Sequence, residues 1–78
     1  MTMFKGMKIN EVLESLNNLG YGIITISKYS DGEIFSIVYS RPEIIMIDGN
    51  RRIFLPSGDF DCYFEDGICE AEAPVLED

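Results

Sequence analysis

The fold of this chain is decided between Asp31 and Gly67, in the stretch DGEIFSIVYSRPEIIMIDGNRRIFLPSGDFDCYFEDG. Aspartate–glycine turn pairs punctuate it at regular intervals: Asp31-Gly32, Asp48-Gly49 and Asp66-Gly67. Such pairs favour tight turns, and the segments between them are rich in the β-branched and aromatic residues that favour strands. The pattern predicts an antiparallel β-meander of about five to six short strands.

Working outward from these turns, the meander should cover about residues 22–73. The expected strands are 22–30, 33–40, 43–48, 51–55, 59–65 and 68–73. In the first hairpin, a two-residue turn at Asp31-Gly32 pairs Ile26 with Ile37 and Ile24 with Tyr39 on one face. Apolar side chains then gather on that face, as a sheet packed on one side requires.

The segment before the meander, about residues 8–19, predicts an amphipathic helix that ends at Gly20. Its apolar positions recur at helical spacing: Ile9, Val12, Leu13, Leu16 and Leu19. The chain is therefore expected to be one small acidic α+β domain spanning residues 1–78, with a loose acidic tail at 74–78.

The second hairpin, residues 43–55, has apolar side chains on both faces. A turn at Gly49-Asn50 pairs Asp48 with Arg51, whereas a turn one residue earlier sets Ile45 opposite Arg52, so we expect the first register. One apolar face is then formed by Ile45, Ile47 and Phe54. A strand that is apolar on both faces needs two covers. Either the twisted sheet curls into a partly closed small barrel, the form we favour, or this face meets a partner such as a second copy, in a homodimer.

Charge is distributed unevenly along the chain. The net charge is −8, yet residues 1–52 hold six acidic and six basic side chains and are neutral. Residues 53–78 hold eight acidic side chains and no basic one. Charge confined to one region indicates an interaction surface more than uniform acidity does.

Most of these acids fall in a third hairpin, residues 59–73. Alternation places Asp59, Asp61, Tyr63 and Glu65 on one side of its first strand. A type I′ turn at Asp66-Gly67 then sets Tyr63 opposite Glu70 and Asp61 opposite Glu72, so that all the strand acids share one face. The predicted partner-binding residues are Asp59, Asp61, Tyr63, Glu65, Asp66, Glu70 and Glu72.

Two aligned rows of carboxylates resemble a nucleic-acid backbone in charge spacing. One strand presents a carboxylate about every 6.6–6.8 Å, so two adjacent strands give one per roughly 3.4 Å, close to the phosphate spacing of a DNA strand along its axis. Opposed like charges destabilise a strand pair, which favours a functional reason for them. The alternative is a solvated face that keeps the protein in solution and deters edge pairing.

The sequence lacks the residues that a catalytic, cofactor or metal site requires. There is no histidine, no glycine-rich phosphate loop and no calcium-loop spacing around Asp59 and Asp61, so no enzyme, cofactor or metal site is expected. Cys62 and Cys69 lack C-x-x-C spacing and are expected to be free thiols. No apolar run approaches the ~20 residues of a membrane span, and no signal peptide is evident, so we expect a cytoplasmic protein that binds no membrane.

In size and charge the chain is similar to the small acidic inhibitors that phages encode against host proteins that handle nucleic acid, such as restriction or CRISPR components. This likeness implies a phage anti-defence or anti-CRISPR type of inhibitor, which acts in the host cytoplasm. Its partner would be a basic, nucleic-acid-binding protein, and the inhibitor itself would not bind nucleic acid. Two alternatives stay open: an antitoxin or immunity protein that plugs a basic active site, and a small structural or oligomerisation module.

Overall fold

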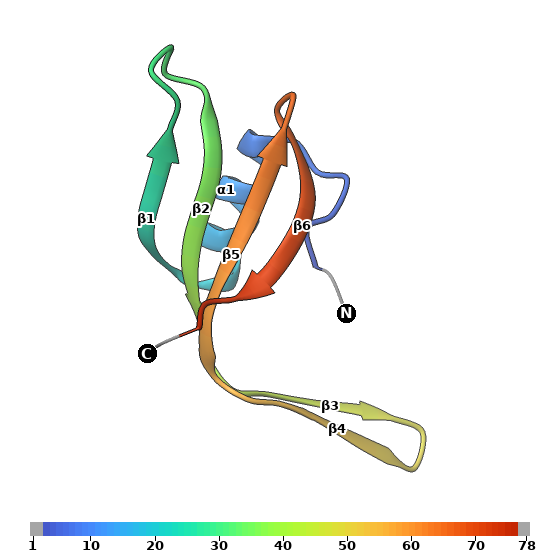
Figure 1. The fold of residues 1–78 in the computed structure, drawn as a ribbon. Helices are drawn as coiled ribbons and strands as arrows, with labels where there is room; N and C mark the ends of the chain where they lie inside the picture. Colours follow the sequence, from blue (N-terminus) through green and yellow to red (C-terminus); the bar gives the residue numbers. More distant parts are fainter. Residues whose placement is uncertain (1–2, 77–78) are drawn as a thin grey trace.

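The computed structural model describes residues 3–76 and contains one helix followed by six antiparallel strands (Figure 1). The elements are α1 (Ile9–Leu19), β1 (Gly22–Lys28), β2 (Ile34–Arg41), β3 (Ile44–Asp48), β4 (Arg51–Leu55), β5 (Gly58–Glu65) and β6 (Ile68–Pro74). The predicted α+β class is confirmed, and every strand begins and ends within two residues of its predicted position. No helix in the described range is long and apolar enough to cross a membrane.

Four strands form the main sheet, in the order β1-β2-β5-β6, and β3 and β4 form a separate two-stranded sheet. The meander is thus interrupted between its second and third sheet strands by an inserted hairpin. Within residues 3–76 the main sheet stays open, so the favoured alternative of a partly closed barrel is wrong. The inserted strands leave the sheet and therefore cannot help to close it.

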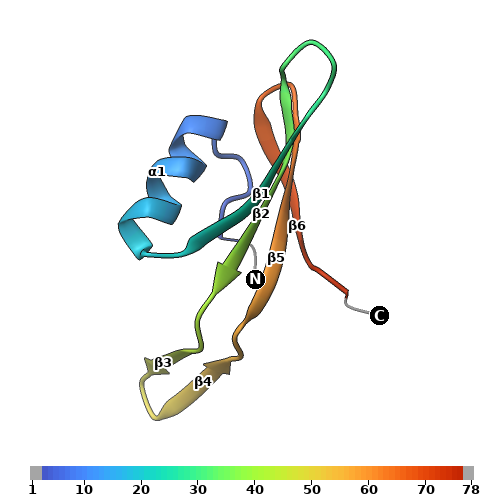
Figure 2. The same ribbon diagram turned by 90° about the vertical axis from the view of Figure 1, so that its left-hand side faces the viewer.

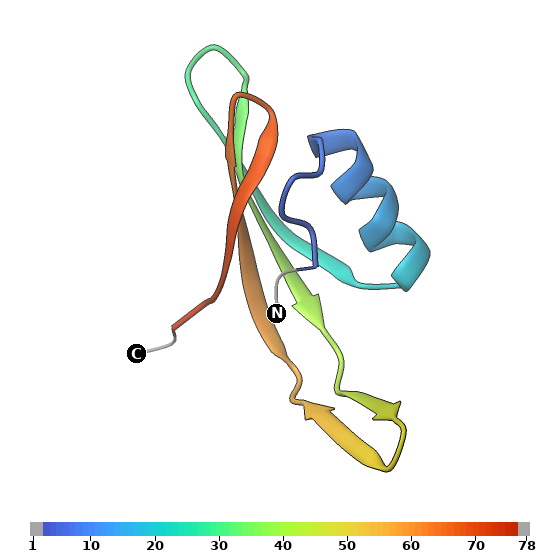
Figure 3. The same ribbon diagram turned by 90° about the vertical axis from the view of Figure 1, so that its right-hand side faces the viewer.

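Helix α1 covers one face of the main sheet and leaves the other face open (Figures 2 and 3). Val12 and Leu16 are fully buried against the sheet. Gly20 ends the helix as predicted, because its backbone is left-handed with φ 74°, a conformation that costs glycine little. The chain then turns directly into β1.

The first hairpin confirms part of the predicted register. Ile26 pairs with Ile37, but Tyr39 pairs with Ile23 rather than with Ile24, because a ladder irregularity between Ile23 and Thr25 inserts one residue. A single extra residue moves the side chains before it to the opposite face. The same strand is a sheet edge, and interruptions of this kind discourage edge-to-edge pairing.

Tyr39 lies at the centre of the core, on the sheet face that carries α1. Its ring contacts three others: Phe4 edge-on at 5.5 Å, and Tyr21 and Phe60 in stacked arrangements at 6.2 and 5.9 Å between centroids. Ile37, beside it on β2, is also fully buried. The segment before α1 thereby contributes a core residue, Phe4, that the helical pattern did not include.

At its carboxyl end the chain is tied to the sheet through Val75, whose N–H donates to the Asp59 carbonyl at 2.9 Å. β6 itself includes Pro74. Part of the segment predicted as a loose tail is therefore attached, and its last two residues, 77 and 78, lie outside the described residues.

Candidate protein-binding surface

The acidic hairpin is formed by β5, β6 and the turn between them. Asp66 and Gly67 both have positive φ, 52° and 78°, which is the type I′ geometry that an Asp-Gly pair was predicted to adopt. Close to the turn, Phe64 pairs with Cys69 and Glu65 with Ile68. The hairpin therefore begins in the predicted register.

Beyond those pairs the register shifts, because Glu70 is an extra residue without a partner in β5. Tyr63 consequently pairs with Ala71 rather than Glu70, and Asp61 pairs with Ala73 rather than Glu72. The predicted opposition of like charges is wrong. A bulge of this kind reverses the face of each residue that follows it, so Glu72 leaves the acidic face.

Glu72 instead pairs with the buried Cys62 and turns toward the core. Its carboxylate accepts two hydrogen bonds, one from the Phe4 N–H at 2.9 Å and one from the Tyr39 hydroxyl at 3.0 Å. It thereby fastens the segment before α1 to the sheet. Glu72 belongs to the structural framework, and the prediction that it lies with the other strand acids is corrected.

The open face of the sheet keeps Asp59, Asp61 and Glu65 at alternate positions of β5, with Tyr63 among them. Tyr63 is 45% exposed, and the neighbouring Asp61 charge is the main reason that its pKa is raised above 10.0. Asp61 also accepts a hydrogen bond from the Ser36 hydroxyl of β2. This acidic face is one row of carboxylates, about 6.6–6.8 Å apart where neighbouring, and not the two rows predicted.

Two further predicted residues, Asp66 and Glu70, are exposed at the turn and the bulge of the same hairpin. Together with β5 they leave five of the predicted acids at or near the solvent: Asp59, Asp61, Glu65, Asp66 and Glu70. We call these five residues and Tyr63 the acidic surface.

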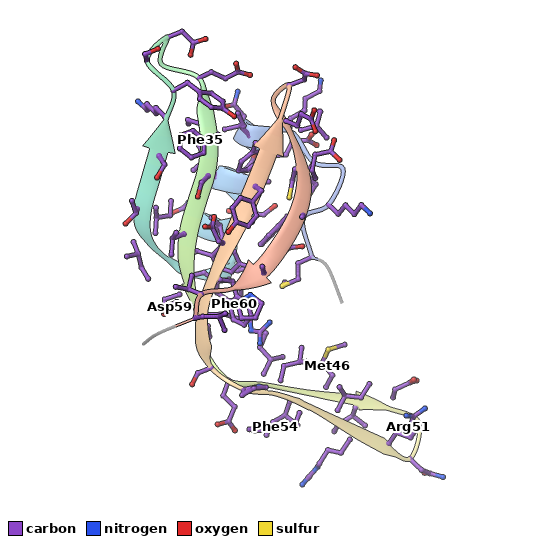
Figure 4. The ribbon with its side chains drawn as sticks, viewed as in Figure 1. Phe35, Met46, Arg51, Phe54, Asp59 and Phe60 are labelled. Carbon is purple, nitrogen blue, oxygen red and sulfur yellow. The ribbon has the colours of Figure 1, made fainter. Side chains whose placement is uncertain are left out.

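The inserted hairpin, residues 44–55, projects from the main sheet as an arm (Figure 1). Its register is the predicted one, with Asp48 opposite Arg51 and Ile45 opposite Phe54. Met46 and Phe54 lie on opposite sides of it (Figure 4). The predicted apolar face is largely exposed: Ile45 by 56%, Ile47 by 76% and Phe54 by 57%.

Arg41 anchors the base of this arm, a role that sequence reasoning missed. Its Nη2 donates to the Pro56 carbonyl at 2.8 Å, and its guanidinium lies 4.0 Å from the centre of the Phe60 ring. Pro42 and Pro56 flank the arm, and neither has an N–H with which to continue a strand ladder. The arm is therefore set at a fixed bend from the sheet.

A cleft of about 270 Å³ opens where the arm meets the sheet. It is lined by Met3, Tyr39, Arg41, Leu55, Phe60, Glu72, Ala73 and Pro74. Its volume is below the usual range for small-molecule sites. The Tyr39 hydroxyl donates to Glu72 within it, whereas the Nε of Arg41 is buried there without a hydrogen-bond partner. Within the described residues, no group of three His, Cys, Asp or Glu side chains is arranged to hold a metal ion.

Both cysteines are free and buried on the core face, as their spacing predicted. Burial is the main cause that raises the pKa of the Cys62 thiol above its ordinary 9.0 and that of the Tyr39 phenol above 10.0. Each group loses water that would stabilise its anion. Neighbouring negative charge, from Cys69 and Glu72 respectively, acts in the same direction.

We expect the free energy of unfolding to fall as the pH rises above about 9. The unfolded chain ionises Cys62 and Tyr39 near 9.0 and 10.0, whereas the folded chain retains both protons. The stabilisation is therefore complete below these values and is lost above them, by about 1.4 kcal/mol per pH unit for each ionising group. Urea unfolding followed by circular dichroism measures it. Tyr39→Phe should flatten the part above pH 10, and a stability unchanged up to that pH contradicts the expectation.

Comparisons with known proteins identify no relative: no protein-family model, no curated protein and no solved structure matches this chain.

Proposed function

We propose that this protein is a non-enzymatic inhibitor that binds a basic, nucleic-acid-binding protein through its acidic surface and blocks that protein's nucleic-acid groove. The observation that supports it most is the carboxylate row of β5, Asp59, Asp61 and Glu65, on the sheet face that α1 leaves uncovered. We infer an inhibitor of the phage anti-defence or anti-CRISPR type, which acts in the host cytoplasm.

Three features of the acidic surface favour binding over mere solubility. Asp61 is held in place by the Ser36 hydroxyl, so less side-chain entropy is lost when it meets a cation. Tyr63 offers an exposed aromatic ring among the charges, the kind of residue that anchors interfaces. The turn acid Asp66 and the bulge acid Glu70 extend the negative field along the hairpin.

Because Glu72 turns toward the core, the acidic surface imitates a nucleic acid less closely than two rows of carboxylates would. A single carboxylate row has about half the charge density of the two rows that the sequence predicted. Binding should therefore depend on the local fit to a basic groove, with Tyr63 as an anchor, more than on continuous imitation of a phosphate backbone. Association should still be fast and sensitive to salt.

Charge reversal at Glu65 and Glu70 should weaken partner binding by at least tenfold without unfolding the protein, because both side chains are exposed. The double variant Glu65→Lys, Glu70→Lys is used as immobilised bait in extract of the cell in which the protein acts, beside wild type. The matched control, Glu14→Lys with Glu33→Lys, changes net charge equally at exposed sites elsewhere. We expect at least tenfold less capture by the first variant only, since opposed like charges cost several kcal/mol.

The captured protein should also bind duplex DNA or RNA, and excess nucleic acid should compete it from the bait. If wild type and the Glu65, Glu70 variant retain the same proteins in the same amounts, the acidic surface has no part in binding. If nucleic acid does not compete, the groove assignment is wrong even where binding is confirmed.

A further inference from the structure

The arm is the least covered part of the molecule. One of its faces is half-buried and contacts the core at Ile44, whereas exposed Ile45, Ile47 and Phe54 share the other face. Isolated two-stranded hairpins are only marginally stable in water. An apolar hairpin that projects in this way needs a cover that a single copy of the chain does not provide.

The overall dimensions indicate how much more surface the chain exposes than a compact domain of its length. The radius of gyration is 13.5 Å, against about 11.5 Å for a compact domain of this length. The accessible surface is 5595 Å², against about 4,800 Å² for a compact monomer of this mass. The excess of roughly 800 Å² is close to one partner's share of a standard protein–protein interface.

The arm is also presented in a defined orientation. Arg41 joins its base to the sheet through the Pro56 carbonyl and the Phe60 ring. A surface that is fixed in advance loses less entropy on binding.

Charge along the arm indicates what covers it. Register places Arg52 opposite Ile47, at the tip of the apolar face, and exposed Glu43 lies at the base just before β3. The face therefore has a basic side chain, Arg52, at the tip of the arm, apolar side chains in the middle, and an acidic side chain, Glu43, where the arm joins the sheet. Two such faces packed antiparallel about a two-fold axis bring each Arg52 to the other copy's Glu43.

We propose that the face of the arm formed by Ile45, Ile47, Arg52 and Phe54 packs against the same face of a second copy, in an antiparallel two-fold dimer. The two acidic main sheets then lie at opposite ends of the paired arms, which limits their repulsion. This surface does not overlap the acidic surface, so the dimer does not depend on the proposed inhibitor function. A basic groove that accepts the acidic surface would instead repel Arg51, at the tip of the arm (Figure 4), and Arg52, which follows it in β4.

Sedimentation equilibrium of the full chain tests the proposal. Wild type should be a dimer, and Ile47→Ser with Phe54→Ser should be a monomer. The control pair, Leu19→Ser with Ile24→Ser, removes apolar side chains of similar exposure, 48% and 53%, and should stay dimeric. Circular dichroism confirms that each variant is folded. Wild type that is still monomeric at concentrations on the order of 1 mM, where an association of only about −4 kcal/mol is detectable, overturns the proposal.

Exchanging the charges of Arg52 and Glu43 tests the antiparallel arrangement of the two arms. Arg52→Glu alone and Glu43→Arg alone should each weaken the dimer by about tenfold, since each dimer holds two copies of the contact. The double variant Arg52→Glu, Glu43→Arg should return to within about threefold of wild type. A dimer that persists in the Ile47, Phe54 variant, or a double variant weaker than both single ones, shows that another surface is used.

Discussion

Tyr39→Ala should lower the free energy of unfolding by about 3–5 kcal/mol, the usual cost of deleting a buried aromatic ring. A domain of this length has only about 4–12 kcal/mol in total, so this loss is a large part of its stability. Tyr39 is 1% exposed, and its ring is the one that joins Phe4, Tyr21 and Phe60. Its loss separates the segment before α1, the start of β1 and β5 at once.

Chemical denaturation followed by far-ultraviolet circular dichroism measures this loss. Tyr39→Phe keeps the ring and removes only the hydroxyl that donates to Glu72, so it should cost about 1–2 kcal/mol. Tyr63→Ala, at a ring 45% exposed on the other face, should cost less than about 1 kcal/mol. If the Tyr39 and Tyr63 alanine variants were equally stable, the core would be centred elsewhere.

The strands and turns could be predicted from the sequence because each one is recorded locally. The Asp-Gly pairs lie at or beside the turns, although only Asp66-Gly67 forms the two-residue turn itself. The middle hairpin has one register in which Asp48 meets Arg51 and Ile45 meets Phe54. Its apolar residues on both faces indicated that each face needs something to pack against. The sequence did not show whether curling or a partner supplies them, because both satisfy the same pattern.

The bulges could not be predicted, and they decide which face several residues occupy. Strict alternation assumes an uninterrupted ladder, yet extra residues at Ile24, Phe35 and Glu70 displace everything on one side of them. The bulge at Glu70 lets Cys69 stay in the core while Glu72 reaches the Phe4 N–H. That partner is 68 residues away, so no local pattern records it.

The second large effect is therefore expected at an acid that the sequence placed on the binding face. Glu72→Lys should lower the free energy of unfolding by about 2–4 kcal/mol, because it removes a charged acceptor from two donors, the Phe4 N–H and the Tyr39 hydroxyl, that lie in or beside the core. Glu70→Lys, two residues away in the exposed bulge, changes the charge equally and should stay within about 0.5 kcal/mol of wild type. Denaturant midpoints of the two variants provide the comparison.

Comparing Glu72→Lys with Glu70→Lys also distinguishes an acid that stabilises the fold from an acid that binds the partner. Glu72→Gln keeps an acceptor oxygen, so it should recover about half of the free energy of unfolding that Glu72→Lys loses. If Glu72 only attracted a basic partner, Glu72→Gln would not differ from Glu72→Lys in stability. If Glu72→Lys were as stable as Glu70→Lys and only partner capture were lost, Glu72 would lie on the acidic surface after all, and the register with Asp61 opposite Glu72 would apply in solution. If Glu72→Lys unfolds while Glu70→Lys folds and fails to capture, the bulge is what divides the acids of one hairpin between stability and recognition.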